Sequence, residues 1–373
     1  MLDKKLADAM SEKYGVPMED VLLIGLNYLT TRSDMPYRRV RFKLRLGGEE
    51  EFFLGVPITS GESPFYLSQR DQRLLLDGEP VGSIREAEND TCDTSYLRKQ
   101  GRVLTLNSNS RGSCTGCAFC GTVSQNKNDT EPMDTEIKLT EFVERLYGDR
   151  ETYRRVRPHL DGNFPEDGKP DLSHLEQVAV LTGCFGSEKR TVDHIRMVND
   201  VFSRYGFDGE VFYVGCEVAS EGALDTLARE VRNFALCLSL ECFTRREKLM
   251  KEVKSRIMLG DAQRILDATT VRGFPANFNY VMGLDPFDEM KEGFETMASH
   301  VSRFPVVNVF QPHSQEQERL RAAEASDVEY YLRARKAIES MFMDSTLRPR
   351  PWENYRPLWY VKFGDEAIKD IRI

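Results

Sequence analysis

Six short apolar segments alternate with longer amphipathic segments over most of the chain. The apolar segments cover residues 102–108, 177–183, 210–215, 235–241, 276–283 and 306–312. Their length and their content of Val, Leu, Phe and Tyr predict buried β-strands. Helical periodicity predicts helices at 135–148, 189–206, 221–231, 243–259, 261–271, 287–304 and 326–343. Strands that alternate with helices predict a parallel sheet with crossover helices, either doubly wound or curled into an open barrel of the TIM type.

The first 95 residues have a different pattern. A helical start is followed by alternating, turn-rich segments at 37–48, 50–58, 64–68 and 73–84. We interpret residues 1–95 as a small N-terminal α/β domain, residues 96–325 as the core barrel and residues 326–373 as a C-terminal helical and aromatic cover. The tail at 348–360 contains both tryptophans, and we expect it to pack across the open side of the barrel. Polar residues at 149–174 suggest an insertion.

Parallel α/β folds place their chemistry where the strands end. In this chain the first strand leads into a cysteine loop at 114–120, and the other strands end at 183–188, 215–217, 240–247, 283–286 and 310–314. Nearly every residue of chemical interest falls in these segments. We therefore expect one functional site on the rim formed by the carboxyl ends of the strands.

The composition narrows the classes of function. The chain has 51 basic and 60 acidic residues, a net charge of −9, and no block of basic residues that would bind nucleic acid phosphates. No run approaches the roughly 18 apolar residues that a membrane helix needs, and the first residues lack the apolar core of a signal peptide. The sequence therefore predicts a cytoplasmic protein that binds neither nucleic acid nor a membrane.

Three of the eight cysteines, Cys114, Cys117 and Cys120, have the spacing C-x2-C-x2-C. Close clustering of cysteines in an intracellular chain predicts metal binding rather than disulfides. Three thiolates can bind three irons of a [4Fe-4S] cluster and leave the fourth iron open to a small molecule. A structural zinc site, with Cys92 or a histidine as fourth ligand, is the alternative. The other cysteines are scattered, which is typical of small buried residues.

The segment CTGCAFC at 114–120 resembles the cluster loop of the radical S-adenosylmethionine (radical SAM) superfamily. That family uses C-x3-C-x-Φ-C, with Φ aromatic, directly after the first barrel strand. Here Phe119 supplies the aromatic residue, which the resemblance places beside the cofactors, and the first spacing is one residue shorter. The resemblance covers about residues 100–325. It implies an open (β/α)6 barrel in which the three cysteines hold a [4Fe-4S] cluster.

The ends of later strands resemble the parts of that family that contact SAM. GCFGSE resembles the GGE motif, which implies that the methionine part of SAM is bound by Gly183, Gly186, Ser187 and Glu188. YVMGLDPFDE resembles the segment that packs near the adenine, which implies a contact at Gly283. By position, the ribose and carboxylate contacts fall to Glu217, Ser239, Glu241 and one of Arg245, Arg246 or Lys248. For the two arginines, a solvated helix face is the alternative.

Four residues at strand ends are candidates for contact with the substrate: Cys184, Cys216, Glu217 and His313. For the two cysteines the alternative is a small core residue. For His313 the alternative is a satisfied surface histidine.

The resemblance also implies a reaction. The reduced cluster cleaves SAM to methionine and a 5′-deoxyadenosyl radical, which abstracts hydrogen from a substrate. A donor such as flavodoxin or ferredoxin supplies the electron, and the acidic charge favours a small-molecule substrate in a biosynthetic step. Two alternatives stay open: a peptide-modifying radical SAM enzyme whose residues 1–95 grip a leader peptide, and a non-catalytic iron–sulfur or zinc protein.

Overall fold

The computed structural model describes residues 2–48, 50–90, 96–99, 101–107, 116–121, 132–148, 170–181 and 185–368. Its largest sheet has seven strands in the order β13-β12-β11-β10-β9-β8-β7. The strands are β7 (Tyr96–Arg98), β8 (Val103–Leu106), β9 (Gln177–Leu181), β10 (Glu210–Gly215), β11 (Phe234–Glu241), β12 (Ala276–Met282) and β13 (Val306–Val309). All neighbours from β8 to β13 pair in parallel, whereas β7 pairs antiparallel with β8.

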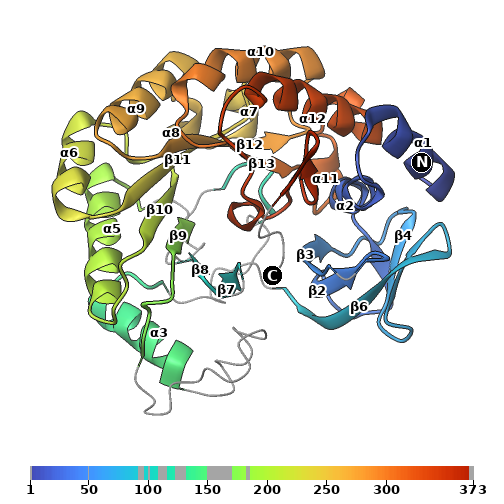
Figure 1. Ribbon diagram of the computed structural model, residues 1–373, viewed down its shortest axis with the longest axis horizontal. Helices are drawn as coiled ribbons and strands as arrows, with labels where there is room; N and C mark the ends of the chain where they lie inside the picture. Colours follow the sequence, from blue (N-terminus) through green and yellow to red (C-terminus); the bar gives the residue numbers. More distant parts are fainter. Residues whose placement is uncertain are drawn as a thin grey trace.

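The strand order decides between the two predicted folds. A doubly wound sheet reverses its strand order near the middle, so that helices cover both faces. Here β8 to β13 lie in chain order from one edge to the other, and the helices lie along the outer side of the curled sheet (Figure 1). The predicted open barrel is therefore confirmed, and the doubly wound alternative is excluded.

Long amphipathic helices form the outer layer of the barrel. They are α3 (Glu136–Gly148), α5 (Glu188–Ser203), α6 (Glu221–Glu230), α9 (Leu259–Val271), α10 (Phe287–Met297) and α12 (Val328–Phe342). In α5, for example, Ile195, Val198 and Phe202 recur at helical spacing and are fully buried. Among the residues that the structure describes, no helix combines the length and the apolarity needed to cross a membrane.

The prediction of one continuous helix at 243–259 is wrong, because the structure has two single-turn helices there. They are α7 (Arg246–Leu249) and α8 (Glu252–Ser255), separated by Met250 in extended backbone conformation. Met250 is buried against the cysteine loop, so packing overrides the local helical pattern. The other short helical turns are η3 (Ala298–His300), α11 (Gln315–Glu318), η4 (Ala323–Ser326) and η5 (Pro351–Glu353).

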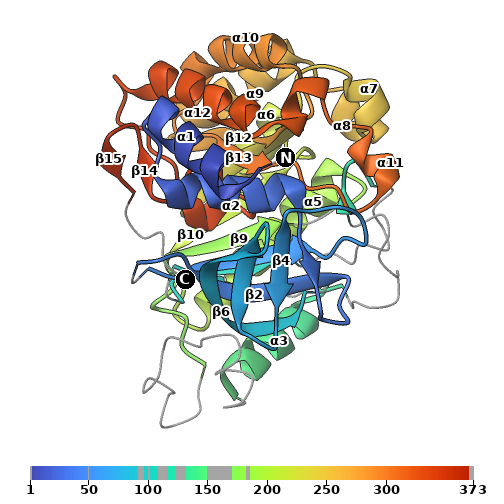
Figure 2. The ribbon, with the colours of Figure 1, turned by 90° about the vertical axis from the view of Figure 1, so that its right-hand side faces the viewer.

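The N-terminal region contains two helices, α1 (Lys4–Tyr14) and α2 (Met18–Leu29), and a second sheet of strand order β1-β4-β5-β6-β2-β3 (Figure 2). Its strands are β1 (Arg32–Ser33), β2 (Arg39–Arg45), β3 (Phe52–Pro57), β4 (Phe65–Ser68), β5 (Arg73–Leu76) and β6 (Glu79–Asn89). One face of β2 carries Val40, Phe42 and Leu44, which are fully buried. The residues that alternate with them are cations that pair with carboxylates: Arg39 and Arg41 with Asp90, and Lys43 with Glu86.

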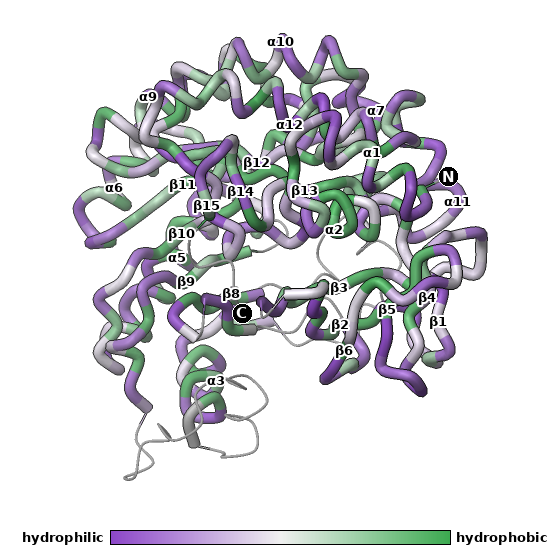
Figure 3. The backbone as a smooth tube through the Cα atoms, turned by 45° about the vertical axis from the view of Figure 1, so that its right-hand side comes forward, coloured by the Kyte–Doolittle hydropathy of each residue, from purple (hydrophilic) through white to green (hydrophobic). Residues whose placement is uncertain are grey.

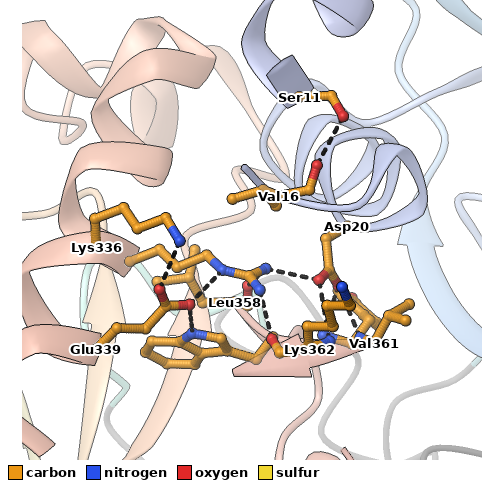
Figure 4. A network of polar contacts seen from close by, with 11 residues as sticks. Ser11, Val16, Asp20, Lys336, Glu339, Leu358, Val361 and Lys362 are labelled. Carbon is orange, nitrogen blue, oxygen red and sulfur yellow. Dashed lines mark hydrogen bonds and ion pairs between the residues drawn. The ribbon is translucent and has the colours of Figure 1, made fainter. Parts of the chain in front are cut away.

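A buried ionic network joins the N-terminal helices to the C-terminal part of the chain (Figure 4). Asp20 of α2 accepts a hydrogen bond from Arg335 of α12 at 2.8 Å and from the backbone N–H of Tyr360 at 2.7 Å. Arg335 also pairs with Glu339 at 2.8 Å, and Trp359 donates to the same carboxylate at 3.0 Å. The network fixes α2, which is largely hydrophobic (Figure 3), against α12.

One apolar core runs from the N-terminal helices to residue 363. The domain boundaries at residues 95 and 325 therefore stay a prediction.

The C-terminal tail crosses between the two edges of the barrel sheet, as the sequence predicts. At one edge, Arg98 of β7 donates to the carbonyl oxygen of Trp352 at 3.0 Å. At the other edge, Asn308 of β13 accepts from the backbone N–H groups of Tyr355 and Arg356 at 2.8 and 2.9 Å. The chain ends in a short hairpin of β14 (Lys362–Phe363) and β15 (Glu366–Ala367).

The interior of the barrel is layered. At the amino ends of the strands, Arg303 pairs with Glu210 and Glu353, and Gln177 donates to Glu353 at 2.9 Å. Above this ionic layer lies a small apolar layer of Ala179, Phe212, Ala235, Cys237 and Val306. The amino end is therefore filled by structural contacts, which leaves the carboxyl end for function.

Candidate functional site at the barrel mouth

The described end of the cysteine loop lies across the barrel mouth, against the ends of strands other than its own. This part, residues 116–121, follows β8 but contacts the segments after β11, β12 and β13. The backbone N–H of Ala118 donates to the carbonyl oxygen of Leu249 at 2.9 Å. Apolar neighbours surround Cys117 and Phe119, namely Cys242, Leu249, Met250, Val281, Leu284 and Phe310. The loop therefore closes over the far side of the mouth.

The described thiols have surroundings that fit an iron–sulfur cluster. Cys117 is 6% exposed and Cys120 is half-buried, and a tight turn joins them, with the N–H of Cys120 donating to the carbonyl oxygen of Cys117 at 2.9 Å. Burial raises the pKa of the Cys117 thiol, which the Lys254 cation and the backbone N–H of Lys251 oppose. Hydrogen bonds to sulfur and limited solvent exposure are features that tune iron–sulfur clusters.

The third cysteine of the motif, Cys114, lies outside the described residues. Within the described residues, no group of three or more His, Cys, Asp or Glu side chains is arranged to hold a metal ion.

Glu217, which follows β10, shapes the loop after β9. Its carboxylate accepts hydrogen bonds from the backbone N–H groups of Phe185 at 2.7 Å and Gly186 at 2.9 Å, and from the hydroxyl of Thr191 at 3.0 Å. Gly186 has φ +87°, a left-handed conformation that favours glycine. Glu217 is thus engaged with the predicted SAM-binding segment itself. Gly183 and Cys184, the remaining predicted residues of this segment, lie outside the described residues.

Glu188 makes the reciprocal contact toward the loop after β10. Its carboxylate accepts from the N–H groups of Ala219 and Ser220 and from the hydroxyl of Ser220, each at 2.7 Å. Burial alone would raise the pKa of Glu188, but the hydrogen bonds from Ser220 and Ala219 outweigh it and keep the pKa below its usual value. Ser187 caps α5, because its side chain accepts from the N–H of Arg190.

A bulge at the end of β11 sets the position of Glu241. The register between β11 and β12 shifts between Ser239 and Glu241, and Glu241 has φ +69°. Its carboxylate pairs with Lys254 at 2.5 Å and accepts from Asn279 at 2.8 Å. Burial by itself would lower the pKa of Lys254, but Glu241, Cys117 and Cys216 together outweigh it and hold the pKa well above its usual value. Ser239 is 4% exposed.

Asp285, after β12, fixes the loop after β11. Its fully buried carboxylate accepts from the N–H groups of Phe243 at 2.7 Å and Thr244 at 3.0 Å, and from the hydroxyl of Tyr280 at 2.8 Å. As with Glu217, a carboxylate from one strand end therefore holds the loop of the preceding strand. Such contacts are charge-assisted and fix the loop backbone strongly.

The two arginines after β11 bind backbone carbonyl groups. Arg245 donates to Leu284 and Leu320. Arg246 is buried and donates to Leu240 and Cys242 at 2.6 Å each, and to Lys254 at 2.7 Å. The structure thus engages both side chains with loops, whereas Lys248 is exposed.

Three further predicted residues also lie at the mouth. Gly283 has φ +109°, and a Cβ atom there would lie 2.9 Å from the Tyr331 hydroxyl, so the packing of α12 requires this glycine. Cys216 is 5% exposed. His313 follows β13 and faces Gly121, where a Cβ atom would lie 2.4 Å from its Nε2.

Sequence reasoning missed Lys254, Asp285 and Gln317. Asp285 lies two residues after the glycine of the strand-five segment, so its position was a usable signal. Lys254 and Gln317 lie on the single-turn helices α8 and α11, where neither periodicity nor a motif marks them.

No protein-family model and no curated protein matches the chain. Among solved structures, Streptococcus suis SuiB bound to S-adenosylmethionine matches with 12% identity and a TM-score of 0.37, over 60% of this chain and 43% of that chain. SuiB bound to the precursor peptide SuiA matches with 11% identity and a TM-score of 0.35, over 59% and 41% of the two chains.

A third similar structure is the radical S-adenosylmethionine methyltransferase TsrM from Kitasatospora setae, with cobalamin and a [4Fe-4S] cluster bound. It matches with 8% identity and a TM-score of 0.33, over 52% of this chain and 34% of that chain. This chain therefore spans less than half the length of these three structures. The chain is thus similar, at low identity, to solved structures that bind S-adenosylmethionine or a [4Fe-4S] cluster, while its fold rests on the strand order and pairing given above.

Proposed function

We propose that this chain is a radical SAM enzyme. The observation that supports the proposal is the place of its C-x2-C-x2-C loop, which follows the first parallel strand of an open barrel and whose described part, residues 116–121, lies at the carboxyl ends of the later strands. Parallel barrels have their active sites at this end. A purely structural zinc knuckle would gain nothing from that location.

Cys114, Cys117 and Cys120 would hold a [4Fe-4S] cluster by three of its irons, leaving the fourth for SAM. When bound, the reduced cluster would supply the electron that cleaves SAM to methionine and a 5′-deoxyadenosyl radical. The chain's own part is to bury this chemistry. Phe119 of the loop and Met250 lie in one buried apolar cluster with Cys117, which shields this thiol from water.

The residues proposed to bind SAM lie on loops that carboxylates hold in place. Gly183, Gly186 and Ser187 would meet the methionine part, and Glu217 supports this proposal by fixing the loop backbone at Gly186. Glu188 fixes the adjacent loop.

For the ribose, Ser239 and Glu241 are the proposed contacts. Lys254 and Asn279 orient the Glu241 carboxylate.

The substrate is proposed to be a small molecule that is transformed in a biosynthetic step in the cytoplasm. Cys184, Cys216 and His313 would face it. A flavodoxin or ferredoxin would deliver the electron. The net charge of −9 supports neither nucleic acid nor another polyanion as substrate.

The test is anaerobic reconstitution of the whole chain with iron and sulfide, followed by reduction with dithionite and addition of SAM. We expect an electron paramagnetic resonance signal of a reduced [4Fe-4S] cluster that changes with SAM, and formation of 5′-deoxyadenosine. Replacing Cys114, Cys117 or Cys120 by Ala should remove both signals, whereas Cys92→Ala should retain them.

Two results would contradict the proposal. A cluster whose signal ignores SAM would indicate a binding or electron-transfer protein. Zinc in place of iron, or loss of metal in Cys92→Ala, would indicate a closed four-ligand site.

A further inference from the structure

The two ends of the barrel sheet meet at the mouth through loops. The cysteine loop follows β8, and the segment 313–317 follows β13, at the opposite end of the run of parallel strands. Because the sheet is open, no backbone pairing joins these strands. Any contact between the two loops must therefore come from side chains or irregular backbone.

The side chain of Gln317 makes that contact. Its Nε2 donates to the carbonyl oxygens of Ala118 at 3.2 Å and Cys120 at 3.1 Å. Its Oε1 accepts from the backbone N–H of His313 at 2.8 Å. One amide group thus binds two carbonyl groups of the cysteine loop and one N–H of its own segment.

A second, steric contact brings the same loops together. The ring of His313 lies so close to Gly121 that a Cβ atom there would be 2.4 Å from Nε2. The glycine directly after Cys120 therefore leaves the space into which His313 fits. The segment after β13 is seated directly on the cysteine loop.

From the other side, the carbonyl oxygen of Leu249 accepts from the N–H of Ala118 at 2.9 Å. The turn between Cys117 and Cys120 is therefore held at two points that come from different strand ends. Fixing a backbone before a ligand binds removes an entropy cost that binding would otherwise carry.

We propose that Gln317 is a positioning residue that ties the cysteine loop across the open barrel and pre-sets Cys117 and Cys120 for metal binding. The role in metal binding rests on the proposed function, whereas the contact between Gln317 and the cysteine loop does not. Gln317 touches no reacting atom in this proposal. It acts through the backbone of the loop.

Two variants separate the parts of the contact. Gln317→Ala removes all three hydrogen bonds. Gln317→Glu keeps an acceptor for His313 but loses both donors to the cysteine loop. The matched control is Gln315→Ala, on the same short helix, because Gln315 is exposed.

The first measurement uses metal-free, reduced protein and the rate of iodoacetamide alkylation at each cysteine, followed by peptide mass spectrometry. Both Gln317 variants should raise the rates at Cys117 and Cys120 about tenfold, because two hydrogen bonds to the loop are lost. Cys237, buried in the middle of β11, is the internal reference and should keep its rate. A general loss of stability would instead raise the rate at Cys237 as well.

The second measurement is the rate at which reconstituted protein loses iron to a chelator, which should also rise about tenfold in both variants. If circular dichroism shows that Gln317→Glu is folded and its alkylation rates at Cys117 and Cys120 are unchanged, Gln317 does not hold the loop. This result would contradict the proposal even if Gln317→Ala fails to fold. Failure of the unaltered chain to bind iron would instead contradict the proposed function. The alkylation rates, measured without metal, would still show whether Gln317 holds the cysteine loop.

Discussion

The carboxylate of Glu217 accepts a hydrogen bond from the backbone N–H of Gly186 at 2.9 Å. Glu217 follows β10, and Gly186 belongs to the loop after β9, so one strand end determines the shape of the loop of its neighbour. Three donors converge on this single buried carboxylate. Gly186, in the left-handed region at φ +87°, depends on that support.

Glu217→Gln should lower the free energy of unfolding by about 2–3 kcal/mol, because charge-assisted hydrogen bonds become neutral and one acceptor becomes a donor facing an N–H. We also expect SAM to bind at least about tenfold more weakly. Urea denaturation and equilibrium titration with SAM measure the two effects. Glu292→Gln, exposed on α10, is the control and should change neither. Full SAM affinity in Glu217→Gln would show that the loop after β9 is not part of the SAM site.

Gly121→Ala should displace the cysteine loop, because its methyl group would lie 2.4 Å from Nε2 of His313. Overpacking of this kind costs about 1–3 kcal/mol. Iron retained after reconstitution and desalting should therefore fall clearly, and adding His313→Ala should restore most of it. Gly222→Ala, in α6 where no atom lies within 4 Å, should leave iron retention unchanged. If His313→Ala does not restore iron retention, the defect of Gly121→Ala lies in the loop backbone and not in the clash with His313.

Lys254→Met should destabilise the fold by roughly 3–5 kcal/mol, because it leaves the Glu241 carboxylate buried without its cation. The side chains of Lys254 and Glu241 are only 16% and 8% exposed. Adding Glu241→Gln removes the stranded charge, so the double variant should be more stable than Lys254→Met alone. A double-mutant cycle by urea denaturation measures this coupling. If the losses in free energy of unfolding of the two single variants simply add in the double variant, the two side chains are not coupled. Lys291→Met, at an exposed ion pair on α10, is the control.

His194 should make stability depend on pH. Burial lowers its pKa from 6.5 to about 4, and its ring stacks on Phe185 at 4.5 Å. The unfolded chain therefore binds this proton at a higher pH than the folded chain does. The stability that neutral His194 contributes is complete above about pH 6.5 and is lost as the pH falls toward 4.

At pH 5 the loss should reach roughly 2 kcal/mol. Urea denaturation at pH 5 and pH 7.5 should show this difference in the unaltered chain, and His194→Gln should reduce it by that amount. An equal pH dependence in both proteins would show that other groups control acid sensitivity.

The strand and helix pattern could be predicted well because it depends on local periodicity. Each of the six predicted barrel strands is present, and the helix that failed, at 243–259, is broken where Met250 packs against the cysteine loop. The roles of side chains at the mouth were harder to predict. Glu188, whose contact with SAM stays a prediction, also holds the loop at Ala219 and Ser220, and Arg245 and Arg246 bind backbone carbonyl groups.

The sequence by itself determined the order of the elements, the parallel sheet and the location of the cysteine loop at a strand end, because hydrophobic period and residue spacing are properties of short segments. Only the tertiary structure decided that Gln317 binds Cys120, which is 197 positions away, and that the predicted tail contacts Arg98 at one edge of the sheet and Asn308 at the other. Such contacts depend on how far the sheet curls and on which loops its open mouth brings together. They are made by single side chains whose partners no local pattern specifies.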